Sequence, residues 1–396
     1  MITDRFSTGW FALALAVAVS GCTTSSSDAG GASGSGGSGG STASPKDPSG
    51  SDVTAGKAGG SANAGSGGAG SGSAGSSGMA SGGAGTGSLV PKPEWDWHDY
   101  VDDNPATLGT AERGEYLVDH VLVCGVCHTP SLPDGTPDTT LYLAGSRPYD
   151  FIDIDGTVIT VNAENLTAHD PEGLHTWTDG QIRVAITRGA DDEHYAIYPI
   201  MPYPEYSMLK PEDVDSIIKY LRTVPANDNV VASDYPRPDI HAPAAPVNEP
   251  KVPHTTLKSS DPEYASAERG RYLASVACLN CHTEEVVLPN GMTDHDNPNL
   301  ERAFAGGKQY TFEHMQGMNT SANITPDETG IAGWSVEDIV AAIKEGKEKG
   351  TGRKLCNTHP STPDRYSKMT DEDAKDIATY IHSLPPIKNG PFKCTD

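Results

Sequence analysis

The pattern Cys-X-X-Cys-His occurs twice, at Cys124–His128 and at Cys278–His282. Two thiols three residues apart, with a histidine directly after the second, form the attachment signature of a c-type haem. The sulfurs bond the two vinyl side chains of one porphyrin, and the imidazole becomes the proximal iron ligand. A zinc site would need four ligands in a closed set, and a redox dithiol would need a βαβ context. The sequence shows neither, so we predict two covalent haem c groups, attached through Cys124, Cys127, Cys278 and Cys281 and ligated by His128 and His282.

The two motifs belong to a longer internal repeat. Seven landmarks recur in one order, each 154 to 161 residues after its first occurrence; among them are Ala111–Gly114 against Ala267–Gly270 and Asn165–Thr167 against Asn323–Thr325. Such agreement predicts two copies of one domain. We expect these domains at 91–224 and 263–396. The connector between them, at 225–262, carries eight prolines and is expected to be extended.

Each copy has the periodicity of helices rather than strands. Apolar residues recur on one face from Glu112 to Val123, and a capping box at Thr178–Gln181 opens a helix that Gly189 would end. A third helix begins at Lys210-Pro211. The second copy repeats this scheme at 269–278, 335–344 and 370–384. We therefore predict an all-α fold, with three principal helices per domain joined by long loops. Loops of that length usually wrap something.

The N-terminal ninety residues have a different composition. Trp10–Val19 is an apolar run too short to span a bilayer, and it is typical of an export signal. Val19-Ser-Gly-Cys22 follows and resembles a bacterial lipobox, which predicts a signal peptide at 1–21 and lipidation of Cys22. Residues 23–90 hold 22 of the 44 glycines and almost no aromatic residues. We expect the stretch at 22–90 to be a disordered tether.

The chain is strongly acidic, with a formal net charge of −25. Nearly all of this charge falls after residue 90. An acidic surface repels phosphate backbones, so nucleic acid is not an expected partner. The charge fits solubility or docking to a basic protein.

With these residues in view, the region 91–396 resembles the dihaem c-type cytochromes of bacterial envelopes, and each copy resembles a class I cytochrome c domain. In that family the sixth iron ligand lies on the loop before the last helix, commonly as Met-Pro. The match in the first copy is Met201-Pro202, with Met208 as the alternative. The resemblance therefore implies Met201 as the second axial ligand of the first haem. His/Met ligation raises the reduction potential.

The second copy departs from this pattern. Its corresponding loop contains His359-Pro360 and no Met-Pro. We predict His359 as the sixth ligand, which would give a bis-His haem of lower potential. The alternatives are His314, Met315, Met318, Cys356 or no sixth ligand.

Two cysteines remain after lipidation and haem attachment, Cys356 and Cys394. In an oxidising compartment they predict a disulfide that holds the C-terminal tail beside the ligand loop. The alternative is Cys356 as a thiolate ligand, as in dihaem thiosulfate dehydrogenases, which would leave Cys394 unpaired.

Two further pairs recur in the repeat. Arg147 and Lys308 could pair with haem propionates, although a solvated face explains them better. Asn165 and Asn323, like Trp177 and Trp334, could line the haem pockets or serve packing.

The leading functional hypothesis is a dihaem cytochrome of the periplasm that is anchored by a lipid on Cys22. The resemblance to bacterial lipoproteins favours the outer membrane, because the residue after Cys22 is not Asp. The cytochrome would pass single electrons between other redox proteins of the envelope. A haem enzyme of the peroxidase or thiosulfate dehydrogenase type is the second hypothesis. The cytochrome subunit of a membrane dehydrogenase is the third. The sequence has no acid/base pair near the haem motifs, which argues against the enzyme hypothesis.

Overall fold

The computed structural model describes residues 104–392, except 134–135, 146–147, 153–157, 194, 233–246, 290–292, 312–317, 351–354, 356–358 and 361–364. The chain divides into two units, 1–83 and 84–396, and every described residue belongs to the second. The predicted signal peptide, the lipidation site Cys22 and the tether therefore lie outside the described residues. Among the residues that are described, no helix is long and apolar enough to cross a bilayer.

The first half, residues 104–232, is organised by three helices of ten or eleven residues. They are α1 (Ala111–His120), α3 (Asp179–Arg188) and α5 (Pro211–Leu221). The capping box predicted for α3 is present, because Thr178 Oγ1 accepts from Gln181 N and Gln181 returns a bond to Thr178 N. Gly189 ends α3 in the left-handed region with φ 68°. Two one-turn helices, α2 (Gly125–His128) and α4 (Tyr203–Tyr206), complete this half.

The second half, residues 247–392, also has three principal helices, in the corresponding order. Its principal helices are α6 (Tyr264–Ala277), α8 (Val336–Glu345) and α9 (Asp371–His382). A one-turn helix, α7 (Leu279–His282), follows α6 as α2 follows α1. Helix α6 begins five residues before the predicted start, and α8 opens with a capping box from Ser335 to Asp338. The domain boundaries of the duplication stay a prediction.

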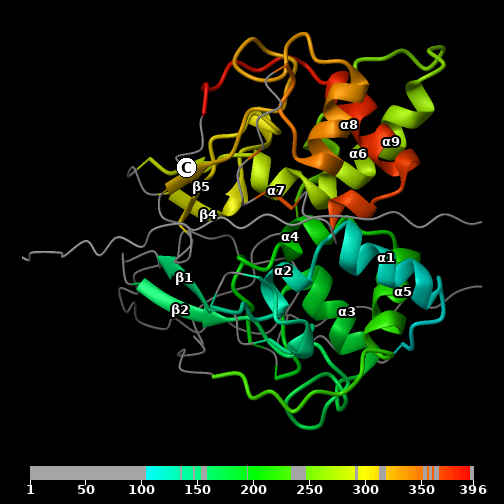
Figure 1. Cartoon of the computed structure of the whole chain (residues 1–396), viewed down its shortest axis with the longest axis vertical. Coiled ribbons are helices and arrows are strands. Elements are labelled where there is room, and N and C mark those ends of the chain that lie inside the picture. The colour runs from blue at the N-terminus through cyan, green and yellow to red at the C-terminus, as the bar shows by residue number, and fades with distance from the viewer. Residues whose placement is uncertain are drawn as a thin grey trace, which may run out of the picture. The chain divides into compact units, whose positions relative to one another are not determined.

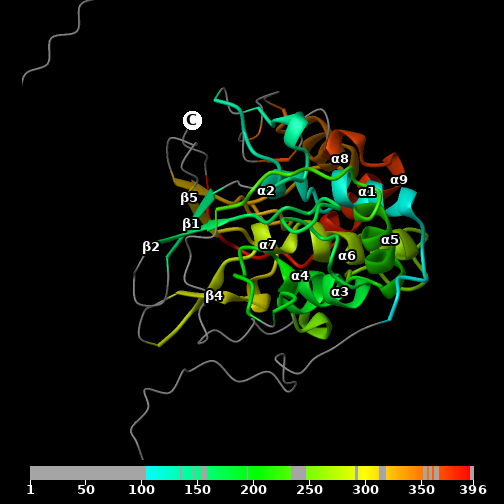
Figure 2. The ribbon, with the colours of Figure 1, turned by 90° about the horizontal axis from the view of Figure 1, so that it is seen from below.

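Short antiparallel hairpins accompany the helices and were not predicted. They pair β1 (Pro148–Ile152) with β2 (Val158–Asn162), β3 (Glu285–Val287) with β4 (Thr293–Pro298), and β5 (Gln309–Thr311) with β6 (Met318–Thr320). In both views β1, β4 and β5 lie at the end of the ribbon away from α1, α5 and α9 (Figures 1 and 2). Four single 3₁₀ turns are described: Thr139–Leu141, Glu249–Lys251, Leu300–Arg302 and Tyr366–Lys368, the last called η4 below. The described part of the chain is therefore helix-rich with few strands.

The first and last principal helices of each half pack together closely, α1 on α5 and α6 on α9 (Figure 1). Gly114 of α1 lies against the backbone of α5, where an added Cβ would come within 1.9 Å of the Ser216 carbonyl oxygen. Gly270 of α6 lies in the same way against the Asp376 carbonyl oxygen of α9, also at 1.9 Å. The recurrent Glu-Arg-Gly in the sequence thus marks a helix crossing that admits no side chain.

Replacing Gly270 by alanine is expected to lower the free energy of unfolding by about 1–3 kcal/mol, because the new methyl group must push α9 away. Thermal unfolding of the purified protein measures this as a fall in Tm. Ala265→Ser, which adds one atom at an exposed position of the same helix, is the control and should leave Tm unchanged. An unchanged Tm in G270A would contradict the close crossing.

The two halves contact each other through a reciprocal pair of tyrosines. Tyr116 of α1 donates to Asp373 Oδ2 of α9 at 2.6 Å, and its hydroxyl accepts from Thr370 N at 3.1 Å. Tyr272 of α6 donates to Asp213 Oδ2 of α5 at 2.7 Å, and its hydroxyl accepts from Lys210 N at 3.1 Å. Tyr116 and Tyr272 occupy equivalent repeat positions. Each half therefore supplies the same donor and the same acceptor, and the two Cys-X-X-Cys-His segments belong to one packed unit.

Candidate haem-binding sites

Each Cys-X-X-Cys-His segment forms a single helical turn directly after the first long helix of its half. His128 N donates to the Cys124 carbonyl at 3.0 Å, and His282 N donates to the Cys278 carbonyl at 2.9 Å. One turn of helix brings side chains three and four residues apart onto one side. Cys124 and Cys127, like Cys278 and Cys281, can therefore reach one porphyrin edge together.

Both histidines are oriented by a backbone carbonyl. His128 Nδ1 donates to the Glu164 carbonyl at 2.7 Å, and His282 Nδ1 donates to the Ala322 carbonyl at 2.8 Å. Burial lowers the pKa of both imidazoles, and the bonds to the carbonyls oppose this effect. A hydrogen bond that fixes the Nδ1 proton leaves Nε2 as the nitrogen available to a metal. The two rings thus have the tautomer that an iron ligand needs.

The repeated Asn-X-Thr sequence explains how those carbonyls are held. Asn165 and Asn323 directly follow the two carbonyl residues, and both are buried. Asn165 Nδ2 donates to the Asn227 carbonyl at 2.9 Å, and Asn323 Nδ2 donates to the Ile387 carbonyl at 2.8 Å. Each asparagine therefore ties the loop to the segment after the last helix. Of the two roles predicted for Asn165 and Asn323, these bonds support packing.

The loop carrying the repeated Ala-Gly is strained in the same way in both halves. Leu143 and Phe304 have φ of 56° and 64°, values that residues other than glycine rarely adopt. The glycines two residues later donate their N–H groups to the carbonyls of His128 and His282, at 2.8 and 2.7 Å. Strain of this kind persists where the surrounding structure over-determines it, and it concentrates at functional sites.

The motif thiols suit thioether bonds better than metal thiolates. Burial, with a smaller contribution from the second cysteine of each motif, raises the pKa of Cys124 and of Cys278 to about 12. These thiols are protonated at neutral pH, whereas zinc binds the thiolate. The donor set, a pair of thiols on one helical turn beside an imidazole with a fixed tautomer, fits a covalently attached haem.

His359 lies near enough to His282 to be influenced by it, and its role as an iron ligand stays a prediction. Burial, together with the neighbouring His282, lowers the pKa of His359 to about 3, so the ring is neutral and able to ligate. Its Nδ1 is buried with no hydrogen-bond partner among the described residues. The ring makes an edge contact with Tyr366, with centroids 5.9 Å apart.

Met201 lies on the turn before α4, partly buried against the hydrophobic core, as does its alternative Met208. The contacts described for Met201 are with the core rather than with His128, so its role as a ligand stays a prediction. His314, Met315, Cys356 and Cys394 lie outside the described residues, and with them the predicted disulfide. Met318 lies in β6, but its side chain is not described.

Lys308 does not lie on a solvated face. Its side chain is 14% exposed, and its ammonium group pairs with Glu285 Oε1 at 3.2 Å and donates to Asn280 Oδ1 at 3.4 Å. Arg147, its counterpart, is outside the described residues. The alternative of a solvated face is therefore wrong for Lys308.

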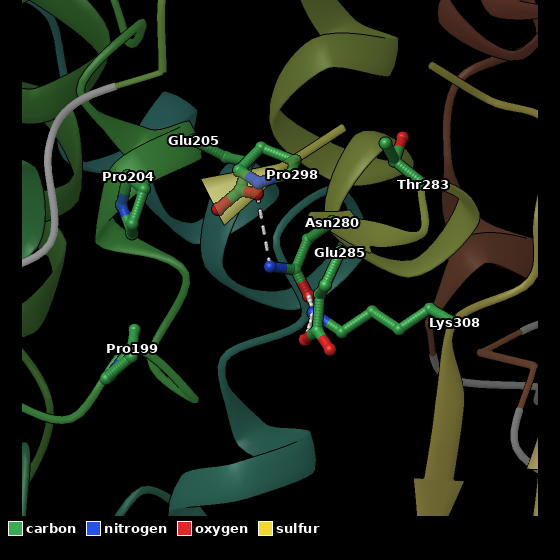
Figure 3. Close-up of a pocket in the computed structure, with 8 residues that line it drawn as sticks. All are labelled: Pro199, Pro204, Glu205, Asn280, Thr283, Glu285, Pro298 and Lys308. Carbon is green, nitrogen blue, oxygen red and sulfur yellow. Dashed lines mark hydrogen bonds and ion pairs between the residues drawn. The ribbon is translucent and has the colours of Figure 1, made fainter. Parts of the chain in front are cut away.

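Sequence reasoning did not single out Glu205 or Asn280. Glu205 of α4 is 2% exposed, and its Oε1 accepts from Asn280 Nδ2 at 3.1 Å. Asn280 is the residue directly before Cys281. This bond joins α4 of the first half to the haem motif of the second, along a small pocket (Figure 3). A glutamate three residues after Met-Pro and an asparagine inside the motif were the available signals, and neither repeats in the other copy.

Buried tyrosines also link the two sites. The pKa of Tyr206 is raised well above its usual value, by burial first and then by Cys124, Cys127 and Tyr366. Tyr366 is likewise raised by burial and by Cys278 and Cys281. Tyr206 and Tyr366 are equivalent repeat positions. Each lies near the thiols of its own half, and Tyr366 also contributes to the raised pKa of Tyr206. The two motifs are therefore close to one shared region.

Comparison with known proteins agrees with this geometry. No family model matches the chain. A "Diheme cytochrome c-type" of Cereibacter sphaeroides is 29% identical over 296 residues, which covers 71% of this chain and 88% of that protein. The chain is a dihaem c-type cytochrome. It carries two covalently bound haem c groups, as its two motifs require.

The cytochrome is also similar to subunits of larger enzymes. The cytochrome subunit of fructose dehydrogenase from Gluconobacter japonicus is 26% identical over 279 residues, covering 68% of this chain. The cytochrome c subunit of a quinone alcohol dehydrogenase from Gluconobacter oxydans is 26% identical over 300 residues, covering 70% of this chain. The cytochrome spans about half the length of these two subunits, 48% and 55%. Its relatives are therefore electron-transfer cytochromes.

Proposed function

We propose that this chain is an electron-transfer protein of the bacterial envelope whose two haems differ in ligation. Cys124 and Cys127 would attach the first haem, ligated by His128 and Met201. Cys278 and Cys281 would attach the second, ligated by His282 and His359. The observation that carries the proposal is the matched pair of motif imidazoles, each with Nδ1 held by a carbonyl at 2.7 or 2.8 Å.

A bound haem supplies a one-electron iron couple. The protein's part is to fix the ligands, exclude water and hold the two sites together. Glu164 and Ala322 hold the proximal imidazoles through their carbonyls. Tyr116 and Tyr272 join the halves by bonds to Asp373 and Asp213. With both haems bound, this fixed arrangement of the chain would let an electron pass within one molecule, from the proposed bis-His site to the proposed His/Met site.

A dehydrogenase is the electron donor that the comparisons favour. Several relatives are cytochrome subunits of dehydrogenases, which points to a role as acceptor for such an enzyme. The net charge of −25 would favour docking to a basic partner surface. The proposed lipid on Cys22 and the tether at 22–90 would keep the folded part near the periplasmic face of a membrane, in our proposal the outer one. Under this proposal the protein has no catalytic residues of its own.

A redox titration of the purified holoprotein tests the function. We expect two reversible one-electron transitions, and we expect no turnover of hydrogen peroxide or thiosulfate. Catalytic consumption of either substrate at rates of the order of 1–10³ s⁻¹ would support the haem-enzyme alternative instead.

A further inference from the structure

Glu205 is a titratable group that the proposed function leaves unused. This side chain is 2% exposed, yet it is a carboxylate in the contact between the two halves. Its Oε1 has one hydrogen bond, from Asn280 Nδ2 at 3.1 Å. Its Oε2 is buried with no hydrogen-bond partner among the described residues. A buried carboxylate that is satisfied on one oxygen only is costly in its charged form.

The nearest positive charge does not neutralise it. Lys308 faces the same pocket, but its ammonium group is 3.2 Å from Glu285 Oε1 and is committed to that second carboxylate (Figure 3). The pocket thus contains two carboxylates and one ammonium group. Burial raises the pKa of Glu205, and Lys308 and the bond from Asn280 oppose this only in part.

The charged groups of the neighbouring helices are engaged elsewhere. Helix α4 packs against α3 and α6. On α3, Arg183 pairs with Asp215, and Asp179 pairs with Arg222. On α6, Arg269 pairs with Asp376, Arg271 pairs with Glu249, Glu268 lies near His254, and Tyr272 bonds Asp213. Tyr203 and Tyr206 of α4 itself are buried.

Glu205 also lies beside the second haem motif. Its hydrogen-bond partner Asn280 directly precedes Cys281. An electron added at the second site would therefore add negative charge near a carboxylate that is already poorly compensated. Electrostatic repulsion between the two charges is strong where the surroundings are dry.

We propose that Glu205 is a redox-linked proton-binding site, which takes up one proton when the cytochrome is reduced and releases it on reoxidation. The inference rests on the proposed electron-transfer function. In the step, a one-electron donor reduces Fe(III) to Fe(II), and the Glu205 carboxylate binds one solvent proton to become the neutral acid. Only the O–H bond forms, and reoxidation reverses both changes. Glu205 lines a small pocket with Asn280, Glu285 and Lys308, and in this proposal the proton arrives through that pocket.

The test is a spectroelectrochemical titration of the holoprotein from about pH 5 to about pH 9. Reduction favours the acid form, so at least one midpoint potential should fall as pH rises. The limit is about 59 mV per pH unit, the value for a tenfold change with one electron. Glu205→Gln keeps the acceptor for Asn280 but cannot titrate, so its potential should be independent of pH. Glu205→Asp should restore the slope, and Glu212→Gln, the same change at an exposed position, should retain it.

An E205Q slope equal to that of the wild type, or a wild-type potential independent of pH, would overturn the inference. Either result leaves two reversible transitions in place, whereas failure of the proposed function would remove them at every pH. Redox-difference infrared spectra of the wild type and E205D provide a second readout, in case E205Q does not fold. The carbonyl stretch of a protonated carboxyl group should appear on reduction and shift in E205D. Its absence from the wild type would count against Glu205.

Discussion

Replacing both Cys278 and Cys281 by alanine is expected to halve the covalently bound haem. Each motif attaches one haem in our account, and the two attachment turns, α2 and α7, belong to different halves of the fold. Removal of one pair of thioether bonds should leave the other site loaded. Haem content per chain after denaturation and extraction measures this directly, and C124A/C127A should give the same half value.

The matched control removes two thiols outside the motifs. C356S/C394S lacks the same number of cysteines but should retain both covalent haems. Full haem content in C278A/C281A would mean that the second motif does not attach haem. Loss of haem in the control would show that thiol number, rather than position, governs loading.

Replacing Met201 by alanine is expected to lower the higher midpoint potential by about 100 mV or more, because axial ligands set haem potentials over a range of about 0.8 V. In the proposed ligation the Met201 thioether raises the potential, and alanine would leave the iron with one protein ligand. Potentiometry of the purified variant measures the shift. The lower potential, assigned to the site of His282 and His359, should move much less.

Met201→His separates ligation from packing. This variant keeps a sixth ligand, so the haem should stay low-spin while its potential still falls toward that of the bis-His site. Met208→Leu, at the neighbouring partly buried methionine, should leave both potentials near their wild-type values. The reverse outcome, with a large shift in M208L and none in M201A, would transfer the ligand role to Met208.

The helices and the haem motifs were predictable because their signals are local. A capping box at Thr178 and a proline at position 211 set helix starts through contacts within one turn, and the structure has both helices. The boundary of α6 was missed because Tyr264–Glu268 lacks a capping side chain. Residue Glu263 at its start makes no side-chain cap bond.

The contacts between the halves could not be predicted in the same way. The bond from Asn280 to Glu205 joins residues 75 apart in sequence, and the bond from Tyr116 to Asp373 joins residues 257 apart. No periodicity encodes such a distance. The repeat did indicate that Gly114 and Gly270 share a role, but only the helix crossing shows that the role is close backbone approach. Lys308 was misjudged because a lysine suggests solvent, whereas here it pairs with Glu285 in a pocket.

Under the proposed function both irons are six-coordinate, the first with Met201 and the second with His359. Electron paramagnetic resonance of the oxidised holoprotein, alongside His359→Ala, tests this coordination. We expect two low-spin signals in the wild type and one new high-spin signal in H359A. A high-spin haem in the wild type would contradict the claim, because an open iron is a site for substrate. Two low-spin signals that the substitution leaves unchanged would remove His359 from the iron.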